Sequence, residues 1–295
     1  MPITSLFHLL ILAAIWGFSF LFTRIAVPDL GAVVLVEYRV CLAAVFLFAV
    51  AMIMRKRLDV RQHWRYYLVL GIFNAALPFM LFSFAAMTLS ASALSILNAT
   101  TPIWGAVVGA VWMRQPLVGR TVLGLTMGVA GVGFVVGLDH WTAQAGAVGA
   151  IVAALTATLC YGIATNYAKQ ATAVDSFSNA HGSMWAASLF LLPAIPFVNV
   201  SSTPDTGVML AVLALGVVCT GIGFLLFFRL VRDIGSTSTL TVTFLIPVFG
   251  MLWGHLFLDE VITPVMMAGS LIVIMGTVLA TGFDLAALKK KAHVS

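Results

Sequence analysis

Neutral polar side chains recur inside long apolar segments of this sequence, and their spacing could form a binding site. Asn98 and Thr101 are spaced i, i+3, so a helix places both on one face. Thr243 lies 145 residues after Asn98. An amide or hydroxyl in apolar surroundings needs a hydrogen-bond partner. Any one of these residues is better explained by a bond between helices, whereas the set as a whole predicts a cavity that binds a solute.

Aromatic and further polar residues at similar depths would complete this cavity. Aromatic rings offer a ligand stacking and apolar contact, and hydroxyl groups add hydrogen bonds. The remaining candidates for substrate binding are Trp16, Ser19, Phe20, Phe79, Phe82, Ser83, Tyr161, Thr165, Phe224, Phe227 and Phe244.

Two ionisable residues, Glu37 and Arg39, also lie inside an apolar segment. Spaced i, i+2 on a helix, they point to different faces and do not simply pair with each other. Ionisable groups at that depth are functional candidates, here for coupling; the alternative is a structural ion pair with another helix. No other apolar segment carries a carboxylate near its middle, which argues against proton exchange for a cationic drug. Several central Lys or Arg residues would be needed for a polyanionic substrate, so we expect a neutral or zwitterionic solute.

One segment raises the question of catalysis: Gly17-Phe18-Ser19-Phe20 superficially matches a glycine-x-serine nucleophile turn. A serine nucleophile needs a histidine base within hydrogen-bond reach, and His181 and His255 fall near the ends of apolar segments. The sequence has no paired intramembrane aspartates and no HExxH zinc motif. We therefore expect no catalytic residue, metal or cofactor, and keep an intramembrane enzyme as the distant alternative.

Composition places these residues in a lipid bilayer. Apolar residues make up 62% of the 295 residues, charged residues only 8%, and the mean hydropathy is +1.10. Soluble domains carry about a quarter charged residues, so a multi-pass, all-α membrane protein is expected. The net charge of +5 comes from residues that flank apolar segments and does not indicate nucleic-acid binding.

The chain repeats itself at an offset of 145 residues. Seven glycine pairs share this offset, where chance predicts about one. They are Gly17/Gly162, Gly71/Gly216, Gly105/Gly250, Gly109/Gly254, Gly124/Gly269, Gly131/Gly276 and Gly137/Gly282. The sequence thus predicts two five-helix repeats, residues 1–145 and 146–295.

Apolar windows of membrane-spanning length predict ten transmembrane helices. They lie near residues 5–25, 33–54, 66–88, 91–113 and 117–138, and again near 150–170, 178–199, 211–233, 236–258 and 262–283. The fourth and ninth contain Pro102 and Pro247, which remove a backbone donor and should kink both helices near Asn98 and Thr243. Glycines of the fifth and tenth predict a tightly packed scaffold pair.

Basic residues predict the orientation of these helices. Those on the side reached after even-numbered helices are Arg55, Lys56, Arg57, Arg61, Arg65, Arg114, Arg120, Lys169, Arg229, Arg232, Lys289, Lys290 and Lys291. Of the remaining two, only Arg24 lies on the opposite side, so both termini are expected in the cytoplasm. Because five is odd, the second repeat should be inverted relative to the first, which is the architecture of alternating-access carriers.

These features resemble the EamA branch of the drug/metabolite transporter superfamily. The resemblance covers nearly the whole chain and includes Trp16-Gly17, Glu37-Tyr38-Arg39, the proline-containing fourth and ninth helices and Asp259-Glu260. Gln115 stands where the family has a glutamate in the first repeat. Within the family the chain looks most like YddG-type exporters of aromatic amino acids. That likeness implies a cavity lined by helices one, three, four, six, eight and nine, and a bacterial inner-membrane location.

The function expected from the sequence is export of amino acids, aromatic or large neutral ones, by alternating access between the repeats. Export of drugs or other small metabolites on the same scaffold is the alternative. The residues leave open whether transport is coupled to protons and which oligomeric state the protein adopts, with a monomer allowed.

Overall fold

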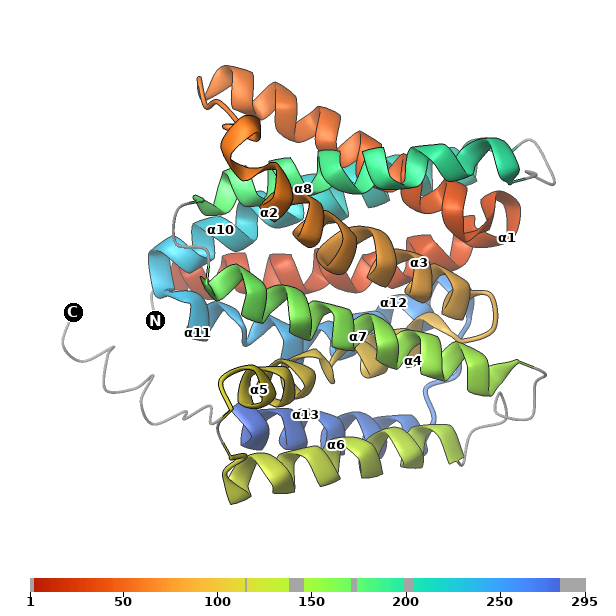
Figure 1. Cartoon of the computed structure of the whole chain (residues 1–295). Coiled ribbons are helices and arrows are strands. Elements are labelled where there is room, and N and C mark those ends of the chain that lie inside the picture. Colours follow the sequence, from red (N-terminus) through yellow and green to blue (C-terminus); the bar gives the residue numbers. More distant parts are fainter. Residues whose placement is uncertain (1–2, 115, 138–145, 171–173, 199–203, 282–295) are drawn as a thin grey trace.

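The computed structural model describes residues 3–114, 116–137, 146–170, 174–198 and 204–281, and its regular elements in these ranges are all helices (Figure 1). In chain order they are α1 (Ile3–Ile53), α2 (Val60–Gly71), η1 (Ile72–Ala76), α3 (Leu77–Ala86), α4 (Ala91–Asn98), α5 (Thr101–Trp112), α6 (Gly119–Gly137), α7 (Ala147–Gln170), α8 (Ser176–Leu191), η3 (Leu192–Phe197), α9 (Thr206–Leu213), η4 (Ala214–Ile222), α10 (Gly223–Ile234), α11 (Ser236–Thr239), α12 (Val242–Leu258) and α13 (Pro264–Thr281). Gln115, Gly282 and Lys289 to Lys291 lie outside the described residues.

The described helices have membrane-spanning character, as the composition predicts. Six helical stretches are long and apolar enough to cross a bilayer, and two shorter apolar helices lie at 119–135 and 242–258. The first stretch, α1, has 51 residues and turns back at Gly31, whose φ of 69° is a conformation that glycine adopts readily. In Figure 1 its first half runs through the middle of the molecule and its second half returns toward the top. Ten separate spans remain a prediction.

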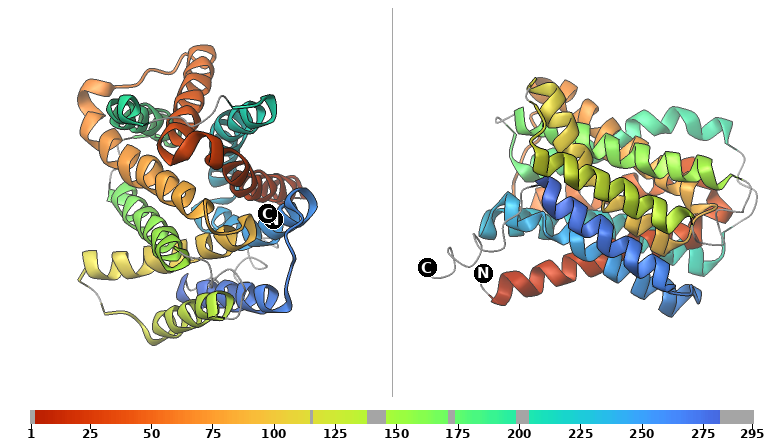
Figure 2. Two further views of the ribbon diagram at one scale, coloured as in Figure 1. Left: turned by 90° about the vertical axis from the view of Figure 1, so that its right-hand side faces the viewer. Right: turned by 90° about the horizontal axis from the view of Figure 1, so that it is seen from below.

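Helices α6 and α13 form a tightly packed pair. They lie side by side at the bottom of Figure 1 and cross the front of the right-hand view in Figure 2. A Cβ atom on Gly131 would stand 3.0 Å from the carbonyl oxygen of Gly269, and one on Gly276 2.7 Å from that of Gly124. These pairings make the two helices antiparallel. The close approach is available because neither helix carries a side chain there.

The same offset of 145 residues relates contacts between other helices. A Cβ on Gly17 would stand 3.1 Å from the backbone nitrogen of Gly250, and one on Gly162 would stand 3.0 Å from that of Gly105. Gly250 and Gly105 are themselves 145 residues apart. The first half of α1 therefore packs on α12 as α7 packs on α5. The two halves of the chain use equivalent surfaces against each other.

The two proline-containing helices differ from each other, contrary to the symmetric kinks predicted. A turn at Ala99 and Thr100 separates α4 from α5, and Pro102 lies in the first turn of α5, where its missing N–H costs little. Pro247 instead lies inside the continuous helix α12, and the interruption in that half falls earlier, between α11 and α12. Equivalent prolines thus have different effects because the surrounding turns differ.

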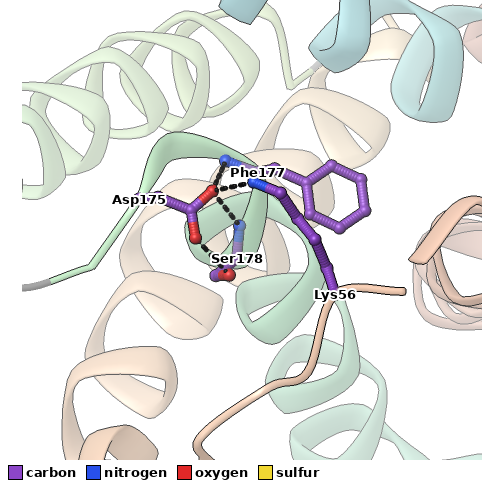
Figure 3. Close-up of polar contacts among 4 residues, drawn as sticks. All are labelled: Lys56, Asp175, Phe177 and Ser178. Carbon is purple, nitrogen blue, oxygen red and sulfur yellow. Dashed lines mark hydrogen bonds and ion pairs between the residues drawn. The ribbon is translucent and has the colours of Figure 1, made fainter. Parts of the chain in front are cut away.

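An ion pair ties the segment after α1 to the start of α8 (Figure 3). Lys56 Nζ lies 2.9 Å from Asp175 Oδ1, and Asp175 also accepts hydrogen bonds from the backbone N–H groups of Phe177 and Ser178. Burial alone would raise the pKa of Asp175, but hydrogen bonds from Lys56 and Ser178 hold that pKa below its usual range. In the predicted topology both segments follow even-numbered helices, so the contact joins residues expected on the same side of the membrane.

On the predicted opposite side of the membrane, Glu260 joins the segment between α12 and α13 of the second repeat to α4 of the first. Its carboxylate accepts hydrogen bonds from the backbone N–H groups of Ala91 at 2.7 Å and Ser92 at 3.0 Å, and from the Ser92 hydroxyl at 2.5 Å. These N–H groups belong to the first turn of α4, where no carbonyl within the helix can accept them. A carboxylate after α12 therefore caps a helix of the other repeat.

Candidate functional site

Arg39 forms the centre of the candidate site, because it joins elements from both repeats. Its Nε donates to Thr220 Oγ1 at 3.0 Å, and its Nη2 donates to Ser19 Oγ at 3.1 Å. The guanidinium carbon lies 3.5 Å from the centre of the Phe79 ring, which makes a cation–π contact. Only 9% of Arg39 is exposed. The charge is thus held deep between α1, α3 and η4.

The π-helix η4 explains how Thr220 reaches this arginine. A Cβ on Gly216 would stand 3.0 Å from the carbonyl oxygen of Arg39, so the backbones of η4 and α1 are in close contact. The Thr220 hydroxyl donates to the carbonyl of Leu215 at 2.8 Å and accepts from Arg39. The first repeat has a π-helix, η1, within the equivalent stretch. Such bulges are frequent at functional sites because they redirect side chains.

Three aromatic rings lie beside the arginine and form what we call the inner aromatic group: Phe20, Phe82 and Tyr161. The ring centres of Phe20 and Phe82 are 5.5 Å apart in an edge-on contact, and those of Phe82 and Tyr161 are 6.3 Å apart. Phe20 follows Ser19, and Phe82 lies one turn after Phe79 on α3. The second repeat contributes Tyr161 of α7, which interacts electrostatically with Arg39 and so places this group beside the arginine.

Glu37 does not take part in this arrangement. Its Oε1 accepts a hydrogen bond of 2.5 Å from Ser188 of α8, while its buried Oε2 has no hydrogen-bond partner among the described residues. Glu37 and Arg39 form no ion pair with each other, as their spacing predicts, and within the described ranges neither pairs with a charged residue of another helix. The described residues therefore give no support to a structural ion pair, and the coupling role of these two residues stays a prediction.

The other predicted site residues fall into separate groups. Thr101 donates to the Asn98 carbonyl at 2.7 Å across the turn between α4 and α5, and Thr243 donates to Leu240 at 2.7 Å near the start of α12. Both hydroxyls thus satisfy carbonyls at helix interruptions. Trp16 contacts Phe227, with ring centres 5.5 Å apart.

The remaining candidates are distributed as follows. Ser83 is buried on α3, Thr165 is exposed on α7, Phe244 is half-buried on α12, and Phe224 stacks on Phe228 of its own helix at 6.0 Å. Of the predicted set, Ser19, Phe20, Phe79, Phe82 and Tyr161 are the residues brought together around Arg39 or beside it.

Thr220 is the residue that the sequence prediction missed. It is a single hydroxyl in the apolar run Gly216 to Phe224, and this isolation is a signal that could have been used. Asn166, by contrast, is a structural residue: it donates to the carbonyls of Gly105 at 2.8 Å and Gly162 at 2.9 Å, which joins α7 to α5.

The serine of the nucleophile-like segment has a different partner from the one that catalysis needs. Ser19 accepts its hydrogen bond from Arg39, whereas His181 accepts from Trp185 and His255 contacts the carbonyl of Glu260. Among the described residues, no group of three or more metal-ligating side chains is close enough to hold an ion.

Three proteins with similar sequences are named as uncharacterized transporters. The chain is 24% identical over 271 residues to the uncharacterized transporter YoaV of Bacillus subtilis. The aligned region covers 90% of this chain and 93% of that protein. It is 24% identical to the uncharacterized transporter YvbV of the same organism, over 89% of this chain and 87% of that protein. An uncharacterized transporter of Archaeoglobus fulgidus is 23% identical over 88% and 92% of the two chains.

A solved crystal structure shares the fold. It superimposes with a TM-score of 0.64 at 19% sequence identity and covers 95% of this chain and 97% of that one. The profile of one family matches twice, over residues 3–137 and 148–282, which are separated by the same 145 residues as the repeated glycines. This protein is therefore a multi-pass membrane protein that belongs to the EamA-like transporter family.

Proposed function

We propose that this transporter exports amino acids, aromatic or large neutral ones, across the inner (cytoplasmic) membrane of a bacterium. The observation that carries the proposal is the inner aromatic group beside Arg39, because an amino acid offers an apolar side chain and charged ends within one small molecule. Phe20 and Phe82 would contact the side chain of the substrate, with Tyr161 completing the wall from the second repeat.

The mechanism we propose is alternating access between two inverted repeats of five spans. Two observations support it: α6 and α13 are equivalent helices that run antiparallel, and Gly17 and Gly162 make equivalent contacts in the two halves. Two similar units that share equivalent interfaces can exchange conformations, so that a site between them opens to each side in turn. In this arrangement both chain termini lie in the cytoplasm, as the basic residues predict.

The predicted polar contacts of the substrate lie at the helix interruptions. Asn98 and Thr101 flank the turn between α4 and α5, and Thr243 lies just after the turn that precedes α12. Backbone that departs from regular helix within a span is tolerated where it lines a cavity or is buried in protein. We therefore keep these side chains, with Ser83, as hydrogen-bonding candidates for the amino and carboxyl groups of the substrate.

The test is transport by the purified protein in liposomes, measured with labelled phenylalanine, tryptophan, leucine and serine and with a panel of cationic dyes. We expect saturable flux of the aromatic and large aliphatic amino acids that exceeds the flux of serine. Flux of the dyes without that of amino acids would instead identify a drug exporter on the same scaffold. The double variant Asn98→Ala, Thr101→Ala should reduce amino-acid flux; unchanged flux would remove that face from the site.

A further inference from the structure

The positive charge of Arg39 has no counter-charge in the described structure. The ion pairs found there are Lys56–Asp175, Arg229–Asp233 and Arg232–Asp233, and none of them involves Arg39. Its hydrogen-bond acceptors, Ser19 and Thr220, are neutral. A charge removed from water inside a membrane protein is costly unless an opposite charge accompanies it. Among the described residues, the charge of Arg39 is therefore not balanced by the protein itself.

The guanidinium also has donors to spare. Arginine carries five N–H groups, of which Nε uses its one for Thr220 and Nη2 uses one for Ser19. Nη1 has no hydrogen-bond partner among the described residues. Nη1 and Nη2 together present the planar, paired donors that match the two oxygens of a carboxylate. The Phe79 ring contacts one face of the guanidinium. A ligand would therefore bind at the edge of the guanidinium, where its N–H groups point.

The hydrogen bonds to Ser19 and Thr220 do not by themselves require a charge. A neutral donor of similar length could bridge Ser19 and Thr220 and would avoid the cost of burying a cation. Glu37 is the acidic residue closest in sequence, but its carboxylate is engaged by Ser188 of α8. The feature that needs an explanation is thus a cation, and an anionic ligand explains it.

We propose that Arg39 binds the carboxylate of the transported solute, and that the inner aromatic group binds an aromatic or branched apolar portion of the same molecule. The substrate class is then small monocarboxylates with apolar bulk, to which aromatic and large neutral amino acids belong. This inference rests on the proposed function only in that the site between the repeats carries the solute. It assigns the carboxylate to Arg39, and leaves Asn98, Thr101 and Thr243 for the amino end.

The test compares ligands that differ only at the carboxyl group. The probes are L-phenylalanine, 3-phenylpropionate, 3-phenylpropionamide, 4-methylpentanoate and 4-methylpentanamide, measured by thermal shift of the purified protein and by flux into liposomes. Each carboxylate should bind at least about 10-fold more tightly than its amide, since a hydrogen bond to a charged group contributes about 1.5–3 kcal/mol. Equal affinity of acid and amide for the wild-type protein would overturn the inference without any variant being needed.

Variants then locate the effect. Arg39→Gln keeps a donor near Ser19 and Thr220 but removes the charge, so it should abolish the preference for acid over amide, whereas Arg39→Lys should retain part of it. Arg229→Gln is the matched control, because Arg229 is exposed on α10, and it should leave the preference unchanged. A preference that survives in a folded Arg39→Gln protein would overturn the inference.

The remaining outcomes separate this inference from the proposed function. Flux of phenylalanine together with equal flux of the amides would leave the amino-acid proposal standing and reject the role of Arg39. Flux of 4-methylpentanoate that depends on Arg39, without flux of any amino acid, would support the role of Arg39 and reject the amino-acid proposal. If chloride alone shifts the melting temperature, and no carboxylate does, the anion is inorganic. Both the binding of a carboxylate by Arg39 and the export of amino acids would then be rejected.

Discussion

Glu37 and Arg39 lie two residues apart on α1, yet they bind different helices: Glu37 accepts from Ser188 of α8, and Arg39 donates to Thr220 of η4. Each is buried, and each makes a hydrogen bond to a neutral hydroxyl. The second half of α1 therefore presents an acidic side chain to α8 and a basic side chain to η4. This separation is compatible with two independent roles, the one proposed above for Arg39 on the solute and a coupling role for Glu37 that the first prediction tests.

The first prediction concerns Glu37. Its Oε2 is buried without a partner in the described structure, and only a protonated carboxyl could donate from that position. Glutamine cannot take up or release a proton, so Glu37→Gln should keep solute exchange in liposomes but lose any stimulation of flux by an imposed pH gradient. The measurement is flux with and without the gradient. A wild-type protein that ignores the gradient would show that Glu37 is not a coupling group.

The second prediction concerns the α6–α13 pair. A Cβ on Gly131 would stand 2.9 Å from the backbone nitrogen of Val273, so Gly131→Ala must separate the helices and should destabilise the protein by about 1–3 kcal/mol. Gly133→Ala is a control on the same helix, because a Cβ there meets nothing within 4 Å. It should be neutral or slightly stabilising, since alanine favours helix over glycine. Thermal unfolding in detergent compares the two, and equal effects would contradict this packing.

The repeat and its scaffold pair could be predicted from the sequence because glycines at close helix contacts leave a regular signature. The pairs at positions 124 and 269 and at 131 and 276 predicted the packing of α6 on α13, which the structure confirms. The Glu37–Arg39 spacing likewise predicted that the two would not pair with each other. In both cases the deciding feature is the spacing of residues along each helix, which the sequence shows directly.

The details of the candidate site could not be predicted in the same way. Thr220 reaches Arg39 because η4 is a π-helix packed against α1; the repeated Gly216 marks a close helix contact there, but the sequence predicts neither the π-helix nor which helix it contacts. Pro102 and Pro247 hold equivalent positions but sit differently relative to the helix interruptions, since the position of a turn depends on tertiary packing. The contacts between elements far apart in the sequence therefore determine the details of the candidate site, which the repeat alone does not predict.

The third prediction tests the inverted topology. Arg57 follows the second predicted helix and Arg232 lies in the last turn of the eighth, and both side chains are exposed. Single cysteines at these positions, in a protein whose Cys41, Cys160 and Cys219 are replaced, should react with a membrane-impermeant maleimide only from the cytoplasmic face. A cysteine at Asp205 provides the contrast, because it should react only from outside. Labelling of positions 57 and 232 from opposite faces would contradict the inverted repeat.

The fourth prediction concerns the pH dependence of the Lys56–Asp175 contact. The pKa of Asp175 in the folded protein lies below its usual value, so the unfolded state takes up a proton first as the pH falls. The stabilising effect of the carboxylate is therefore fully present above the unfolded-state pKa, near 3.9, and is lost as the pH falls through the lower folded-state pKa. Asp175→Asn keeps an oxygen at the start of α8 but removes this charge.

The melting temperature of the wild-type protein should exceed that of Asp175→Asn at pH 7, and the gap should narrow as the pH falls below the unfolded-state pKa. The difference at pH 7 should be small, within about 1 kcal/mol for the ion pair, because both side chains are more than one third exposed and solvent screens their interaction. Lys56→Met should show a similar loss at pH 7, since it removes the same pair from the other end. A gap between wild type and Asp175→Asn that stays constant from pH 7 to pH 3 would mean that the effect comes from the helix cap alone and not from the charge.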